Sequence, residues 1–125
     1  METNGIERRR DLRLSTSGGQ YQVRFRFRDR QVGSAVLANV SASGCGLEIQ
    51  MADARDMDTG MVLEDLFLFH PDLPCVPLQA TVVRLLGKVP GKTSGYVLAG
   101  VEFSAITPFV SGLIRDHVEA QVAVQ

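Results

Sequence analysis

The chain has 125 residues and a formal net charge of −1 at pH 7, which fits one domain with its own hydrophobic core. No apolar run approaches the roughly 18 uncharged residues that a membrane-spanning helix needs, and the N-terminus lacks the apolar segment of a signal peptide. We therefore expect one domain over residues 1–125, located in the cytoplasm and without membrane insertion.

Charge is unevenly distributed along the chain. Residues 1–30 contain eight arginines and four carboxylates, which gives this segment +4, whereas the remainder of the chain carries −5. This asymmetry predicts an anionic ligand near the N-terminus, while the overall field should attract neither nucleic acid nor a membrane surface. We expect residues 1–8 to form a flexible tail.

The segment from Tyr21 to Phe27 is the clearest strand in the sequence. Its odd positions are aromatic or apolar and its even positions are Gln or Arg, the period of two that is typical of a half-buried strand. Stretches rich in Gly, Pro, Asp and Ser separate the other candidates. These five further strands are expected at 32–40, 45–51, 61–69, 76–86 and 95–104. Short strands at this spacing indicate a barrel or a sandwich.

The last element changes to a helical period. Thr107 is placed as an N-cap, and Pro108 suits the first helical position because its missing N–H costs nothing there. Two neighbouring stripes follow at helical spacing, formed by Phe109, Leu113 and His117 and by Val110, Ile114 and Val118. The sequence therefore predicts a mainly β fold that ends in one amphipathic α-helix.

Arginines cluster just ahead of the first predicted strand. The segment from Glu7 to Arg13 contains an Arg-x-x-x-Arg spacing between Arg9 and Arg13. By itself, such a run is also typical of a solvated, disordered tail.

A second polar motif lies where one predicted strand ends and the next begins. Residues 39–44 read Asn-Val-Ser-Ala-Ser-Gly and match Asn-x-Ser-x-x-Gly. By itself, this motif is equally typical of a polar turn, because Asn, Ser and Gly bond locally to the backbone and tolerate positive φ.

In this order, the two motifs resemble the PilZ domain family, whose signature is Arg-x-x-x-Arg followed by Asp/Asn-x-Ser-x-x-Gly. The resemblance extends along the chain to Gly60-Met61, to Val82-Val83-Arg84 and to the segment 100–103 before the terminal helix. It implies a six-stranded antiparallel PilZ-type β-barrel with a C-terminal α-helix. It also implies binding of the bacterial second messenger cyclic di-GMP.

The resemblance gives each motif residue a role toward this ligand. Arg9 and Arg13 would hold phosphates and read a guanine edge, because a guanidinium can bridge phosphate oxygens, pair with guanine O6 and N7, and stack on a purine. Asn39 and Ser41 would hydrogen-bond the nucleotide, and Gly44 would let the backbone approach a base.

Three further positions belong to the expected site. Arg8 immediately precedes the first motif arginine, which resembles family members that bind an intercalated pair of ligands, so we expect two cyclic di-GMP molecules per chain. Arg10 and Ser43 are candidates for auxiliary contacts.

The implied function is that of a receptor or adaptor and not of an enzyme. Nucleotide binding would change its conformation and relay the signal to an unidentified effector protein that controls motility, attachment or exopolysaccharide. His70 and His117 are the only histidines, and neither metal-ligand spacing nor a recognisable nucleophile accompanies them. We therefore expect no catalytic residue, no metal and no cofactor.

Two other functions remain open. A PilZ-fold adaptor could serve as a protein-interaction subunit without binding nucleotide. A small barrel could instead bind single-stranded nucleic acid on its arginine-bearing strand with help from stacked aromatic rings. Against this last function, Tyr21, Phe25 and Phe27 alternate with the arginines and should point to the opposite face.

Overall fold

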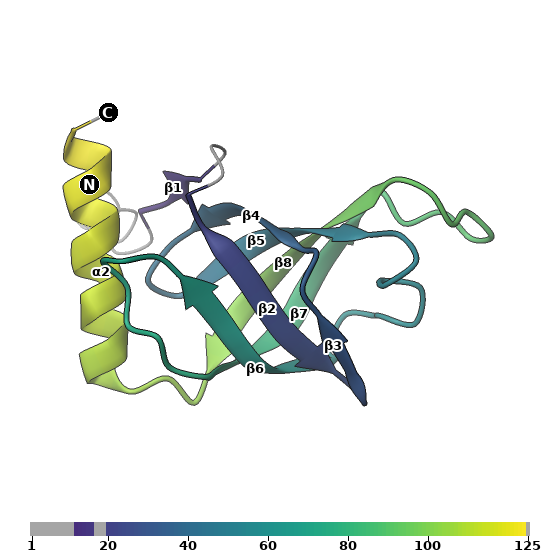
Figure 1. Ribbon diagram of the computed structural model, residues 1–125, viewed down its shortest axis with the longest axis horizontal. Coiled ribbons are helices and arrows are strands. Elements are labelled where there is room, and N and C mark those ends of the chain that lie inside the picture. Colours follow the sequence, from purple (N-terminus) through teal and green to yellow (C-terminus); the bar gives the residue numbers. More distant parts are fainter. Residues whose placement is uncertain (1–11, 17–19, 125) are drawn as a thin grey trace, which may run out of the picture.

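Eight strands and one helix make up the part of the chain that the computed structural model describes, residues 12–16 and 20–124. The strands form an antiparallel sheet that curls around an apolar core, and the helix lies across one end of it (Figure 1). The elements are β1 (Leu14–Ser15), β2 (Gln22–Phe27), β3 (Arg30–Val32), β4 (Val36–Val40), β5 (Gly44–Gln50), β6 (Val62–Phe69), β7 (Leu78–Leu86), β8 (Tyr96–Ser104) and α2 (Pro108–Ala123).

The sheet has the strand order β1-β4-β5-β8-β7-β6-β2-β3. It curves far enough that β2 also comes into contact with β4, which closes the barrel around its core. The prediction of a mainly β, antiparallel fold with a C-terminal α-helix is confirmed. The six longer strands, β2, β4, β5, β6, β7 and β8, are the six that the sequence predicts.

Two short strands, β1 and β3, are additional to the six predicted ones. The single strand expected over 32–40 is in fact divided, because β3 ends at Val32 and β4 begins only at Val36. Strand β3 pairs with β2 through a tight turn in which Arg28 adopts a φ of 58°. A non-glycine residue seldom adopts this left-handed conformation, so nothing in the sequence marked the turn.

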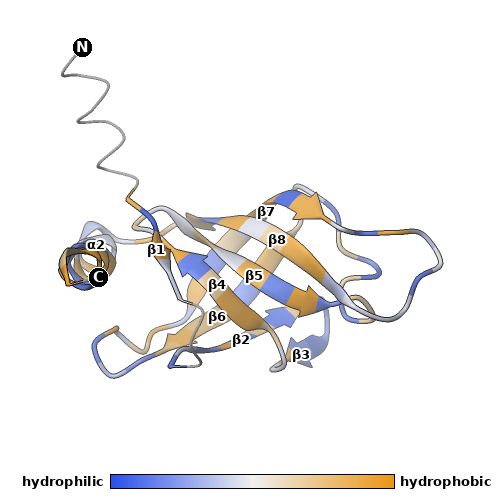
Figure 2. Cartoon of the chain, turned by 90° about the horizontal axis from the view of Figure 1, so that it is seen from above, coloured by the Kyte–Doolittle hydropathy of each residue, from blue (hydrophilic) through white to orange (hydrophobic). Residues whose placement is uncertain are grey.

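The core follows the period of two along the strands. Val23, Phe25 and Phe27 of β2 are at most 3% exposed, whereas Gln22 and Arg24 face solvent. Figure 2 shows apolar and polar residues alternating along the strands. Burying one Phe side chain stabilises a fold by about 1.5–3 kcal/mol, so this one strand contributes a substantial part of the core.

Helix α2 begins at the predicted N-cap. The side-chain oxygen of Thr107 accepts a hydrogen bond from the backbone N–H of Val110 at 3.2 Å, and Pro108 occupies the start of the helix. This cap satisfies one of the backbone donors that a helix leaves unpaired in its first turn.

Among the described residues, no helix has the length and apolarity that a membrane span requires.

The buried face of α2 agrees only in part with the two predicted stripes. Phe109 is 74% exposed, and packing against the core begins with its neighbour Val110. Further along the helix, both stripes reach the barrel, where the buried residues are Ile114, His117 and Val118.

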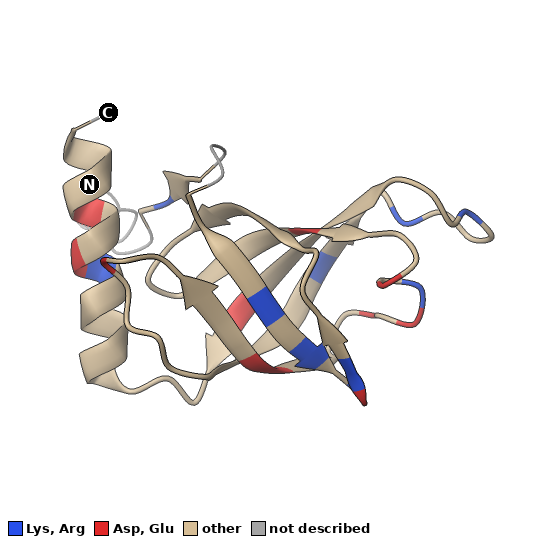
Figure 3. Ribbon diagram, viewed as in Figure 1, with Lys and Arg blue, Asp and Glu red and all other residues tan. Residues whose placement is uncertain are grey.

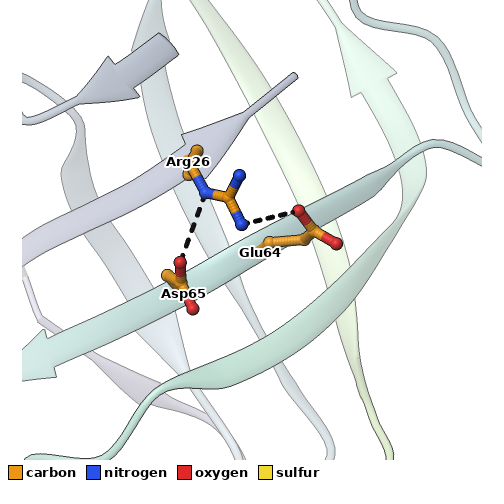
Figure 4. Close-up of polar contacts among 3 residues, drawn as sticks. All are labelled: Arg26, Glu64 and Asp65. Carbon is orange, nitrogen blue, oxygen red and sulfur yellow. Dashed lines mark hydrogen bonds and ion pairs between the residues drawn. The ribbon is translucent and has the colours of Figure 1, made fainter. Parts of the chain in front are cut away.

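The solvent-facing side of β2 carries Arg24 and Arg26, and the neighbouring strand β6 contains acidic residues; Figure 3 shows the two kinds of charge side by side. Arg26 contacts two carboxylates of β6, with Nη2 3.0 Å from Glu64 Oε1 and Nε 3.2 Å from Asp65 Oδ2 (Figure 4). Such exposed pairs contribute little stability, typically below about 1 kcal/mol. They nevertheless balance the positive charge of Arg26 locally.

Aromatic rings on this solvent-facing side come from β6 and not from β2. Phe25 and Phe27 point into the core, as the sequence predicts. The guanidinium of Arg24 instead lies 5.6 Å from the ring centre of Phe67 and 5.4 Å from that of Phe69. The guanidinium of Arg24 therefore already occupies a position over both rings.

Candidate functional site

The Asn-x-Ser-x-x-Gly motif forms the connection between β4 and β5. At its centre, Ser41 is 1% exposed. Its backbone N–H donates to Gly44 O at 2.8 Å, and its Oγ accepts hydrogen bonds from the N–H groups of Ser43 at 3.3 Å and Gly44 at 3.2 Å. The hydroxyl of Ser41 thus holds the turn together from inside.

Replacing Ser41 with Ala should destabilise this turn. The buried backbone N–H of Gly44 and the part-buried N–H of Ser43 lose their acceptor, so we expect the free energy of unfolding to fall by about 1–3 kcal/mol in urea denaturation. Ser43→Ala is the matched control, because the Ser43 side chain is exposed, and it should change stability much less. Equal stability of the two variants would contradict the role assigned to Ser41.

Two glycines of β5 have close neighbours on the adjacent strands. A Cβ on Gly44 would lie 2.1 Å from the carbonyl oxygen of Val101 on β8, closer than any real contact. A Cβ on Gly46 would lie 2.7 Å from Nδ2 of Asn39. Gly44 therefore lets β5 pair with β8, and Gly46 makes room for the side chain of Asn39.

Asn39, Gly46, Gly100 and Arg84 form one row across four neighbouring strands. Asn39 pairs with Gly46, Gly46 with Gly100, and Gly100 with Arg84. Since adjacent strands lie about 4.8 Å apart, the row spans roughly 14 Å on the outer face of the barrel. Gly46 and Gly100, which have no side chains, leave a strip of bare backbone between the amide of Asn39 and the guanidinium of Arg84.

A pocket of about 320 Å³ lies over this row. Its position suits a flat ligand with polar edges, because bare backbone lines the centre while polar groups converge from the sides. Its polar side chains are Arg13, Asn39, Ser43, Arg84 and Glu102, and its apolar side chains include Val83, Leu86 and Leu98.

Arg13 reaches the pocket because β1 pairs with β4. Ser15 lies opposite Asn39 in this pairing, and Leu14, 2% exposed, anchors the short strand in the core. Arg13 precedes them directly, and its Nη1 donates a hydrogen bond to Asn39 Oδ1 at 3.2 Å. The two sequence motifs therefore meet at one point.

Cys45 lies beneath the pocket floor, and its thiol is unreactive. Burial raises the pKa of its thiol to about 12, although the positive charge of Arg13 acts in the opposite direction. The thiol is therefore protonated at neutral pH and is not a nucleophile.

The structure brings Arg13, Asn39, Ser43 and Gly44 to this pocket, while Ser41 lies behind it in the turn. The remaining predicted residues, Arg8, Arg9 and Arg10, lie outside the described residues, as does the tail predicted over 1–8. Sequence reasoning did not predict the other nine lining residues, which include Gly46, Arg84, Gly100 and Glu102. Of these four, Gly46 had a usable signal, since it lies two residues after the predicted Gly44 and therefore on the same face of the strand.

A family model for the PilZ domain matches residues 7–120, which include both motifs and most of α2. The chain belongs to the PilZ domain family. No match was found among curated protein sequences.

Several solved structures share this fold. The PilZ domain of YcgR from Escherichia coli, solved with c-di-GMP, has a TM-score of 0.72 and 15% identity over 94% of this chain and 93% of its own. The K. pneumonia MrkH–c-di-GMP complex has a TM-score of 0.72 and 13% identity over 92% of this chain and 52% of its own. MrkH in its apo state has a TM-score of 0.70 and 12% identity, with 90% and 48% coverage.

This chain therefore spans about half the length of MrkH and nearly all of the YcgR domain. At such low identities the likeness shows a common fold and not a common ligand.

Proposed function

We propose that this PilZ domain is a cytoplasmic receptor for cyclic di-GMP that changes conformation on binding and passes the signal to an effector protein. The main support is the hydrogen bond between Arg13 and Asn39, which joins the two family motifs at the edge of one pocket. Two of the similar structures are complexes with c-di-GMP, which adds to this support.

The pocket offers a complement to each part of this ligand. Cyclic di-GMP carries two phosphodiester charges and two guanines, and Arg13 and Arg84 supply cationic forks for the phosphates or for guanine O6 and N7. The carboxylate of Glu102 can accept from the N–H groups of a guanine edge. The bare strip at Gly46 and Gly100 gives a purine ring access to the backbone.

The apolar side of the pocket supports the same proposal. Leu86 is 50% exposed and Leu98 is 37% exposed, so both present apolar surface to solvent in the free protein. A stacked base would cover part of this surface, and apolar area removed from water contributes about 25 cal/mol per Å².

Arg8, Arg9 and Arg10 complete the proposed site. Arg9 would contact phosphate or guanine together with Arg13, and Arg8 would contact a second, intercalated nucleotide. Arg10 and Ser43 would add auxiliary contacts, whereas Ser41 would act through the turn that positions Ser43 and Gly44. The output to motility, attachment or exopolysaccharide would require a separate effector.

A calorimetric titration of cyclic di-GMP into the full chain tests this function, with GMP as the control ligand. We expect saturable binding of cyclic di-GMP near two ligands per chain, weak or undetectable binding of GMP, and loss of binding in Arg9→Ala. Binding of one ligand would remove the role of Arg8 but leave the receptor. No heat and no shift in melting temperature with the wild type would favour an adaptor that does not bind nucleotide.

A further inference from the structure

Two histidines, a tyrosine and an aspartate meet where helix α2 packs on the barrel. Tyr21 comes from the segment before β2, His70 and Asp72 from the loop after β6, and His117 from the buried face of α2. None of the four lines the pocket assigned to the nucleotide. The cluster is therefore a feature of the molecule separate from the proposed receptor site.

The rings of this cluster are held in place by one another. The hydroxyl of Tyr21 lies 2.7 Å from His117 Nε2, and its ring stacks on His70 with centroids 4.4 Å apart. The two imidazole centroids are 4.8 Å apart, and the backbone N–H of Asp72 donates to His70 Nδ1 at 3.0 Å. These contacts bring His70, Asp72 and His117 close together in the protein without a ligand.

We propose that His70, Asp72 and His117 bind a divalent transition-metal ion, with Zn²⁺ as the best match. Each residue offers one ligand atom, and these atoms all lie within 4.8 Å of one another. Two imidazoles and one carboxylate are a ligand set that Zn²⁺ uses in proteins, with a fourth position left for water. Mg²⁺ and Ca²⁺ prefer oxygen ligands, so this set discriminates against them.

Closing the site requires only a small movement of the loop. Zn²⁺ binds nitrogen and oxygen at about 2.0–2.2 Å, so tetrahedral ligand atoms lie about 3.3 Å apart, and the widest gap must shrink by roughly 1.5 Å. His117 is buried on the helix, whereas Asp72 is exposed and His70 is half-buried. Rotation of the two loop side chains toward the helix supplies this movement.

The surroundings of His117 affect the protonation of its imidazole. Burial, and then the neighbouring His70, lower the pKa of His117, whereas Asp72 raises it. Metal ions bind the neutral form of an imidazole. The ion must exchange some of the present hydrogen bonds of the rings for metal bonds. We therefore expect Zn²⁺ to bind more weakly here than at a structural zinc site. The bound ion would link the loop after β6 to helix α2.

Calorimetric titration of ZnCl₂ into the chelator-treated full chain tests the site, with MgCl₂ as the control salt. Exposed Cys75 lies in the same loop and could bind zinc by itself, so Cys75→Ser is titrated in parallel. We expect one Zn²⁺ per chain and a raised melting temperature in the wild type and in Cys75→Ser, and no such response to Mg²⁺.

Variants of the loop separate this site from adventitious binding. His70→Ala and Asp72→Asn should each weaken zinc binding by at least about tenfold. Asp56→Asn, an exposed carboxylate outside the cluster, should bind as the wild type does. Absence of binding to the wild type, unchanged affinity in both loop variants, or loss of binding in Cys75→Ser alone would each overturn the proposal.

Discussion

Replacing Arg13 with Ala is expected to weaken cyclic di-GMP binding about 100-fold, or about 2.7 kcal/mol. Hydrogen bonds to charged groups contribute about 1.5–3 kcal/mol each, and a phosphate that loses its guanidinium also loses charge neutralisation. The side chain of Arg13 is exposed, so its removal should leave the barrel intact. Calorimetric titration measures the loss, and an unchanged thermal melting curve shows that the fold is retained.

Matched variants make the result specific to this arginine. Arg30→Ala removes another exposed arginine, which bonds the carbonyl of Asp53 and does not line the pocket, so this variant should bind like the wild type. Arg13→Lys keeps the charge but loses the planar fork, so it should recover only part of the affinity. If Arg13→Ala and Arg30→Ala bind alike, Arg13 has no role in the site.

Replacing Gly44 with Ala is expected to lower the free energy of unfolding by about 3 kcal/mol, at the upper end for overpacking. The added methyl group would lie 2.1 Å from Val101 O, and Gly44 pairs directly with Glu102 of β8. Neither partner is the end of a flexible side chain, so β5 and β8 must separate locally to relieve the clash. Urea denaturation measures the change.

The other glycines of the pocket provide a graded comparison. A methyl group on Gly46 meets only the amide of Asn39, which can rotate away, and one on Gly100 makes ordinary contact with Arg84 Cβ at 3.5 Å. Gly46→Ala and Gly100→Ala should therefore fold well but bind nucleotide more weakly. In each variant the added methyl group lies where the purine ring would approach the backbone. Equal stability of the Gly44 and Gly100 variants would refute the packing argument.

The longer strands could be predicted because their side chains alternate between the core and solvent. Strand β1 could not, since its two residues are too few to show a period, and only its pairing with β4 defines it. The hairpin from β2 to β3 was missed because Arg28 and Asp29 are not residues that mark such a turn. These elements depend on tertiary contacts and not on local pattern.

The lining of the pocket was predictable only where the motifs lie. Simple alternation in β7 would place Arg84 on the same face as Ala80 and Val82, which are buried. The register shifts between Val82 and Arg84, and this irregularity turns the arginine outward opposite Gly100. Ser41 was predicted to hydrogen-bond the nucleotide through its hydroxyl. In the structure this hydroxyl accepts hydrogen bonds from the backbone of the turn, which a motif alone does not reveal.

Strand β1 is too short to act independently of what lies on either side of it. Arg13, directly before β1, lines the pocket, and Leu14 is buried in the core. The strand also contacts helix α2. Only the two residues of β1 separate Arg13 at the pocket from the contacts of this strand with helix α2, so a ligand that displaces Arg13 has a short covalent route to the helix.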